Sequence, residues 1–137
     1  MKFTSKQKKA IIQILQNEIN PLKAIYLFGS YVDDNATHTS DIDLAYLTDN
    51  NAITSLQNWK ISNALSRALS INVDLVNLAQ TNTIFRYQII STGKRLYGSG
   101  YEVESFETLA YSFYLRFQEE RKPILDAIYA DKRVFHG

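Results

Sequence analysis

The chain has 137 residues, which fits one domain of ordinary size, and 45% of them are hydrophobic, enough for a packed core. Lysine and arginine total 15 against 14 for aspartate and glutamate, so the formal net charge of +1 argues against nucleic-acid binding through bulk positive charge. The absence of cysteine excludes disulfides and thiolate metal sites, and it suits a reducing cytoplasm.

The N-terminal segment predicts a helix over residues 4–19. Thr4 or Ser5 can cap it, and apolar residues such as Ile11 and Leu15 recur at helical spacing. Polar side chains interrupt this apolar pattern, so the segment is neither a signal peptide nor a membrane span. We therefore expect a cytoplasmic protein with no membrane partner.

Short apolar runs bounded by turn residues predict three strands, at residues 24–28, 41–47 and 72–78. Apolar residues at helical spacing predict three further helices, at residues 52–70, 82–92 and 102–131. The segment KRLYG at residues 94–98 is a candidate edge strand, and Pro123 is expected to break or kink the last helix.

The alternation of strands and helices predicts an α/β (or α+β) fold, a small mixed sheet flanked by helices. The link between the first two strands is too short for a crossover helix. We expect residues 1–98 to form the core of a single domain. Residues 99–137 are then a C-terminal helical arm, packed on the core or on a partner.

One segment carries chemistry at fixed spacing: LFGSYVDDNATHTSDIDLAYL, residues 27–47. Gly29 and Ser30 follow a strand, and after ten more residues Asp41 and Asp43 enter the next strand. Side chains alternate along a strand, so we expect both aspartates on the same side of the sheet. Carboxylates this close repel each other, and a divalent cation such as Mg²⁺ relieves that repulsion.

A further acid, Asp74, interrupts the apolar run of the third strand. If this strand lies beside the second, Asp74 completes a three-carboxylate cluster that can hold two ions about 4 Å apart, as in displacement at phosphorus. Gly29 and Ser30 suit the other end of such a site. Glycine lets the backbone approach phosphate, and a short helix beginning near Tyr31 would direct its N-terminus at the anion.

Each part of this pattern also has a simpler interpretation. An isolated Asp-x-Asp pair is most often a turn or surface feature, and an isolated Gly-Ser pair is most often a turn. Asp74 alone could be a charge that discourages strand-edge aggregation. The combination is much rarer than its parts, and it favours a catalytic site.

The stretch GSYVDDNATHTSDID resembles the signature of the polymerase-β-like nucleotidyltransferases, in which ten residues separate Gly-Ser from Asp-x-Asp. The short chain is most similar to their minimal branch (MNT), and within it to the antitoxins of HEPN/MNT toxin–antitoxin systems. The similarity covers about residues 22–98 and, weakly, the C-terminal arm. The resemblance implies the polymerase-β-like nucleotidyltransferase fold.

The resemblance also implies an activity, a Mg²⁺-dependent transfer of AMP from ATP to a tyrosine hydroxyl of a HEPN ribonuclease toxin. Asp41 and Asp43 would bind both of two metal ions. Asp74 would bind one ion and act as general base, and Gly29 with Ser30 would hold the β- and γ-phosphates. The partners implied are ATP and the toxin, with no direct contact to nucleic acid.

The sequence departs from the family at one place, since many minimal members carry Arg and Gly soon after the Gly-Ser pair. Here Val32, Asp33 and Asp34 follow instead. The cation that holds the triphosphate is therefore left open among four candidates, Lys60, Arg67, Arg86 and Lys94.

Two alternatives to protein modification remain. One is nucleotidyl transfer to a small molecule such as an aminoglycoside, although few residues follow the core to bind such an acceptor. The other is an antitoxin that acts by occlusion alone. An aromatic stripe on the last helix, including Phe113 and Phe117, packs on the core or offers a partner interface.

Overall fold

The computed structural model describes residues 3–33, 36–37 and 39–136, and of residues 120–136 it describes only the course of the backbone. Asp34 therefore lies outside the described residues. The helices are α1 (Ser5–Glu18), the short 3-10 helix η1 (Gly29–Tyr31), α2 (Ser55–Leu69), α3 (Thr83–Thr92) and α4 (Tyr101–His136). The strands are β1 (Leu22–Phe28), β2 (Ile42–Thr48), β3 (Val73–Asn77) and β4 (Lys94–Tyr97). The predicted order of elements is confirmed.

Side-chain caps fix where the helices begin. Thr4 accepts a hydrogen bond from the backbone N–H of Gln7, whose side chain accepts one from the N–H of Thr4, so α1 starts with a capping box. The same motif, built by Thr54 and Gln57, starts α2. Asn82 caps α3 through the N–H of Phe85. Caps of this kind stabilise a helix by about 1 kcal/mol each.

The strands form one mixed sheet in the order β3-β2-β1-β4. β1 is antiparallel to both β2 and β4, as the short β1–β2 link predicted, whereas β2 and β3 run parallel. The chain must therefore cross from the end of β2 back to the opposite end of the sheet before β3 begins, and α2 makes this crossing. Consequently the last residue of β1 and the first residues of β2 and β3 lie at the same end of the sheet.

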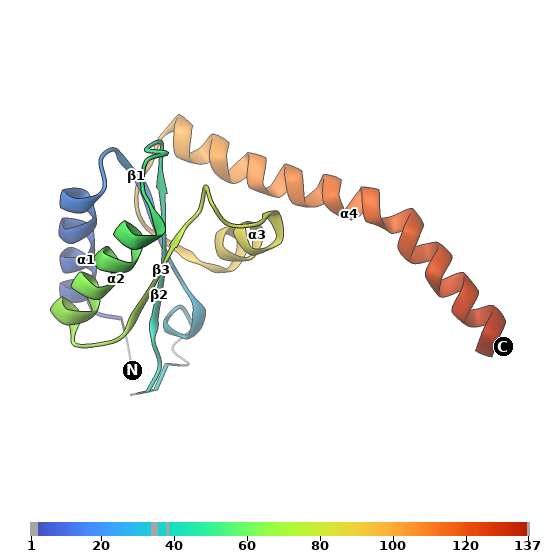
Figure 1. The fold of residues 1–137 in the computed structure, drawn as a ribbon, viewed down its shortest axis with the longest axis horizontal. Helices are drawn as coiled ribbons and strands as arrows, with labels where there is room; N and C mark the ends of the chain where they lie inside the picture. Colours follow the sequence, from blue (N-terminus) through green and yellow to red (C-terminus); the bar gives the residue numbers. More distant parts are fainter. Residues whose placement is uncertain (1–2, 34–35, 38, 137) are drawn as a thin grey trace.

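Helices cover both faces of this sheet, as Figure 1 shows, with α1 and α2 on one face and α3 and α4 on the other. Ile11 and Leu15 of α1 pack with Ile61 and Leu65 of α2 against the first face. The second face is covered by residues of α3 and α4, among them Ile89. Burying a leucine or isoleucine stabilises the fold by about 1.5–3 kcal/mol, so both layers hold the sheet rigidly.

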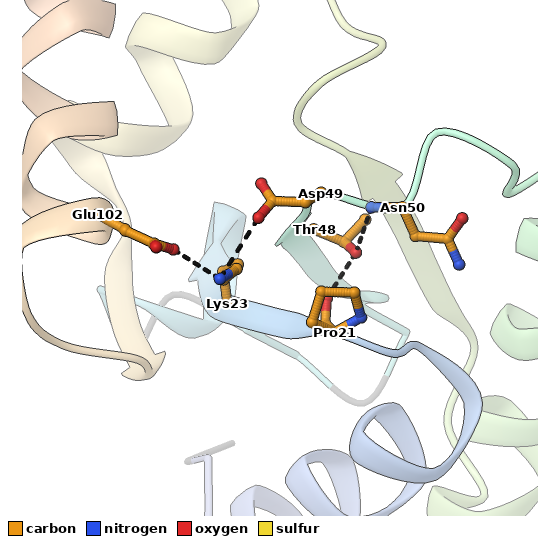
Figure 2. Close-up of polar contacts among 6 residues, drawn as sticks. All are labelled: Pro21, Lys23, Thr48, Asp49, Asn50 and Glu102. Carbon is orange, nitrogen blue, oxygen red and sulfur yellow. Dashed lines mark hydrogen bonds and ion pairs between the residues drawn. The ribbon is translucent and has the colours of Figure 1, made fainter.

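Polar contacts attach the start of α4 to the sheet (Figure 2). Lys23 of β1 forms ion pairs with Glu102 of α4 at 2.6 Å and with Asp49 at 3.4 Å. Farther along α4, Glu107 accepts hydrogen bonds from Arg95 at 2.7 Å and from the buried Tyr26 hydroxyl at 2.9 Å. The Glu107 contacts are the less exposed of the two sets, and they hold α4 against β1 and β4.

Two expectations from the sequence are corrected. The expected break at Pro123 is not found: α4 continues as one helix to His136, although its axis bends in the C-terminal half (Figure 1). Proline removes only one backbone hydrogen bond, and a helix this long retains many others. The second strand begins at Ile42, so Asp41 precedes it rather than belonging to it. Within the part of the chain that the structure describes, no helix is long and apolar enough to cross a membrane.

Candidate functional site

The parallel register of β2 and β3 places two carboxylates side by side. Asp43 lies opposite Asp74 in this ladder, so both side chains project from the face covered by α3 and α4. Phe28, the last residue of β1, lies opposite Asp43 on its other side. The condition that the sequence set for Asp74, a third strand beside the second, is met.

Gly29 closes the site from the β1 side. Its φ of +78° favours glycine, and a Cβ atom at this position would overlap Oδ2 of Asp43. The carboxylate of Asp43 therefore occupies the space left by the missing side chain. The Gly-Ser turn and the Asp-x-Asp motif, ten residues apart in the sequence, are in contact here.

Burial and neighbouring charge act together on Asp43. Desolvation is the larger cause, followed by the negative charges of Asp74 and Asp41 and a hydrogen bond with Asp74, and together they raise the pKa of Asp43 to about 6. Half of a population with that pKa would hold a proton at pH 6. The site therefore disfavours its own ionised form unless positive charge compensates it.

The donor set suits a divalent cation. Among the described residues, no three acidic or histidine side chains converge into a complete metal site. The expected cluster of three is instead the pair Asp43–Asp74, with Asp41 close enough to act on Asp43 through its charge. Mg²⁺ is usually held by one or two carboxylates together with substrate phosphates and water, so this incomplete set fits it.

The Gly-Ser end of the site is a single tight turn. The 3-10 helix η1 begins at Gly29, two residues earlier than expected, and the N–H of Val32 donates to the carbonyl of Gly29 at 3.2 Å. Ser30 is half-buried, and within the described part of the chain its hydroxyl makes no hydrogen bond. The hydroxyl is thus available to an anion beside the carboxylates.

The four candidate cations lie in different places. Arg86 donates to the carbonyls of Leu78 and Thr81, so its guanidinium is engaged within the fold. Lys60 and Arg67 line a hollow of about 370 Å³ on the side of the sheet covered by α1 and α2. That hollow lies on the opposite face from the carboxylates.

Lys94, the fourth candidate, begins β4 opposite Leu27, two residues before Gly29. Its side chain is exposed. By its place in the sheet, Lys94 is close in register to the Gly-Ser turn.

Sequence reasoning missed two aromatic residues beside the site. Phe28 stands on the same side of the sheet as Asp43, and its ring meets that of Phe85 edge to face at a centroid distance of 5.8 Å. Both are half-buried. An apolar wall of this kind helps to explain why desolvation dominates the pKa of Asp43. The signal in the sequence was the position of Phe28, directly before Gly29.

The proposed interface residues lie near α3. Phe113 is 44% exposed. Phe117 lines a mainly apolar hollow of about 440 Å³ together with residues of the first turns of α3, including Ile84 and Phe85. Since Phe85 also contacts Phe28, this stretch of α4 lies near the same aromatic wall as the carboxylates.

Comparison with known proteins gives a family model, a relative and solved structures that agree with one another. The family model "Polymerase beta, Nucleotidyltransferase" matches residues 9–102. Protein adenylyltransferase MntA of Shewanella oneidensis is 36% identical over 121 residues, 88% of this chain and 86% of that protein.

Two solved structures are similar over most of their length. One is a toxin–antitoxin complex with AMP-PNP, with a TM-score of 0.81 and 34% identity over 89% of this chain and 98% of that chain. The other is a complex of the tri-AMPylated Shewanella oneidensis HEPN toxin with MNT antitoxin. It gives a TM-score of 0.76 and 33% identity, covering 90% and 97% of the two chains.

We predict that Gly29→Ala destroys the nucleotide site. The substitution is strained at this φ by about 1–2 kcal/mol, and it also pushes the Asp43 carboxylate out of place. Isothermal titration should show ATP·Mg²⁺ binding weakened about tenfold or more, a loss of about 1.4 kcal/mol.

Gly100→Ala is the matched control, since its φ is +94° but no atom lies within 4 Å of an added Cβ. It should lose similar stability in denaturant unfolding and keep its ATP affinity. Unchanged ATP affinity in a folded Gly29→Ala protein would contradict the assigned contact.

A second prediction concerns pH. Because the folded state raises the pKa of Asp43 from 3.8 to about 6, native protein holds this proton more tightly than unfolded chain does. Stability contributed by the protonated form is therefore lost as pH rises through this window. Asp43→Asn removes the effect, so the variant should be more stable than wild type at pH 8 by roughly 1 kcal/mol, discounted for partial exposure. Near pH 4 the two should be alike.

Denaturant unfolding across pH 4–8 measures this difference. An Asp43→Asn protein that is less stable than wild type at pH 8 would show that the carboxylate is not repelled by its neighbours.

Proposed function

Because this chain belongs to the polymerase beta nucleotidyltransferase family, we propose that it is an antitoxin that transfers AMP from ATP to a tyrosine of a cognate HEPN-family toxin. The observation that carries the proposal is the pairing of Asp43 with Asp74 against Gly29. This pairing occurs in a chain that is similar to a protein adenylyltransferase over 88% of its length. Modification would silence the toxin.

ATP would bind with its triphosphate along the Gly-Ser turn. Gly29 lets the phosphates approach the backbone closely, and Ser30 offers an unengaged hydroxyl as a donor. The cation for the phosphate tail stays open, because Lys94, although opposite the end of β1, shares the sheet face of Leu27 and Leu96, which α1 and α2 cover. This arrangement would present the α-phosphorus to the carboxylates.

Asp74 is suited to the role of general base. Its side chain is exposed, so an acceptor hydroxyl from another protein can reach it, whereas Asp43 is half-buried. The tyrosine oxygen attacks the α-phosphorus and forms the new P–O bond, and the bond to the bridging oxygen breaks. Pyrophosphate leaves, and the hydroxyl proton passes to the Asp74 carboxylate.

The cation would be held by the same carboxylates. Asp41 and Asp43 would bind two Mg²⁺ ions and Asp74 one of them, as the family resemblance implies. Bound there, Mg²⁺ would offset the carboxylate repulsion that raises the pKa of Asp43 and would polarise the phosphate oxygens. The reaction would take place in the cytoplasm, where ATP is available.

The toxin would dock on the apolar stretch of α4. Phe113 is 44% exposed, and Leu109 and Leu115 near it are 52% and 60% exposed, so this part of the helix is apolar on more than one side. A helix with that pattern is usually covered by another surface. Phe113 and Phe117 are therefore the proposed anchors, close to the aromatic wall beside the carboxylates.

The experiment that tests this function is intact-mass spectrometry of a candidate HEPN-family toxin partner, supplied as purified protein. After incubation with the chain, ATP and Mg²⁺, the partner should gain one or more AMP units on tyrosine and lose its ribonuclease activity. Asp43→Asn should leave the partner unmodified, because the site then lacks a metal-binding carboxylate. An unmodified but inactive partner would mean that the antitoxin acts by occlusion.

Two further arms separate docking from chemistry. Phe113→Asp should slow modification by weakening the complex while ATP affinity stays within about threefold of wild type. Replacing the partner with an aminoglycoside tests the small-molecule alternative. Adenylylation of the aminoglycoside, with no modification of the partner, would overturn the proposal.

A further inference from the structure

β3 is an edge strand, and its outer side needs hydrogen-bonding partners. Alternate residues of a strand direct their peptide groups to opposite edges, so those of Asp74 face β2 while those of Val73 and Leu75 face outward. An outward row of unpaired peptide groups is a site for unwanted strand pairing. In this protein, however, side chains of α2 satisfy three of these outward-facing groups.

Three polar residues of α2 lie in one line along the helix, because each is four positions from the next. Asn58 donates to the carbonyl of Leu75 at 2.9 Å. Ser62 donates to the carbonyl of Val73 through a short hydrogen bond. Ser66 accepts the N–H of Val73 at 2.9 Å. The set Asn58, Ser62 and Ser66 is called the clamp below.

The clamp is also tied together at its ends. The Ser66 hydroxyl donates to the backbone carbonyl of Ser62 at 3.0 Å while it accepts from Val73, so its orientation is fixed on both sides. The buried Tyr46 hydroxyl of β2 donates to Asn58 at 2.8 Å, which fixes the amide orientation of Asn58. Within the described residues, no buried side-chain nitrogen or oxygen is left without a partner.

The clamp forms hydrogen bonds with the backbone of Val73 and Leu75, the residues on either side of Asp74. We propose that Asn58, Ser62 and Ser66 are positioning residues, which never touch substrate but hold the β3 backbone so that Asp74 stays in register with Asp43. This role rests on the proposed function, in which Asp74 receives the proton of the acceptor hydroxyl. The clamp fixes the backbone of β3 relative to α2, so the Asp74 carboxylate keeps its place although it repels that of Asp43.

Sealing a strand edge and positioning a base make different demands. An edge seal only has to cover β3, and its loss would lower stability without a selective effect on the chemical step. A positioning clamp must fix the Asp74 carboxylate to a fraction of an ångström, because misplacement by about 1 Å can cost up to about 100-fold in rate. The two roles therefore predict different effects on kcat: loss of a positioning clamp lowers kcat while KM stays nearly constant, and loss of an edge seal leaves kcat nearly unchanged.

The test is Ser66→Ala in the full chain, assayed on its HEPN-family partner with ATP and Mg²⁺. We expect kcat to fall about tenfold while KM for ATP stays within about threefold, because the nucleotide site at Gly29 is not touched. Amide hydrogen exchange should quicken at Val73, whose N–H loses its acceptor. Ser66→Thr keeps a hydroxyl at this position and should restore both kcat and slow exchange.

The control is Ser55→Ala on the same helix, whose hydroxyl makes no hydrogen bond in the described part of the chain. It should leave kcat and Val73 exchange unchanged. If Ser66→Ala does not fold, Ser62→Ala is the second variant, with the same expected split and rescue by Ser62→Thr.

Faster exchange at Val73 with kcat within about twofold of wild type would reduce the clamp to an edge seal and overturn the positioning role. Equal losses in kcat for Ser66→Ala and Ser66→Thr would overturn it as well. A wild-type chain that transfers no AMP is a different failure. It would remove the proposed function and the positioning role together.

Discussion

The repulsion between Asp43 and Asp74 across the β2–β3 ladder is the constraint around which this small fold is built. Two carboxylates opposite each other in adjacent strands destabilise a sheet, and here Asp43 is also partly desolvated. The two helical layers and the β1 pairing must outweigh that cost. The same repulsion suits the site to a divalent cation, whose positive charge would offset it.

Neighbouring elements confine the two carboxylates from opposite sides. On the β1 side, Gly29 leaves no space between the turn and Asp43, so the Gly-Ser turn and the acidic pair are in contact. On the outer side, Ser62 and Ser66 hold the backbone of β3. The Gly-Ser turn, the paired carboxylates and the hydrogen-bonded outer side of β3 therefore follow one another across a four-stranded sheet.

The sequence predicted this centre because its parts are local. Strands, turns and the Asp-x-Asp spacing follow from period, glycine and charge, and the short link required β1 and β2 to be antiparallel. The position of Asp41 outside β2 was missed, because strand ends depend on pairing partners that the sequence does not name. The continuity of α4 through Pro123 was missed for a similar reason. Local helix propensity counts the one backbone hydrogen bond that proline removes, but not the many that the rest of this long helix keeps.

The clamp was the least predictable part. Asn58, Ser62 and Ser66 look in the sequence like ordinary polar positions of an amphipathic helix. Their meaning depends on β3 being an edge strand whose outward peptide groups face α2, and that is a property of the tertiary arrangement. In the sequence, the clamp is visible only as polar residues that recur every four positions beside the apolar residues of the same helix.

The most direct test of this account measures ATP binding and AMP transfer separately in Asp74→Ala. The control is Asp49→Ala, just after the end of β2 and away from the carboxylate pair. If Asp74 is the general base beside a nucleotide held by other residues, ATP·Mg²⁺ should bind within about threefold of wild type. Single-turnover transfer to the partner should then fall by about 100-fold or more. Transfer at the wild-type rate, or a loss of ATP binding equal to the loss of transfer, would contradict the role of the Asp43–Asp74 pair.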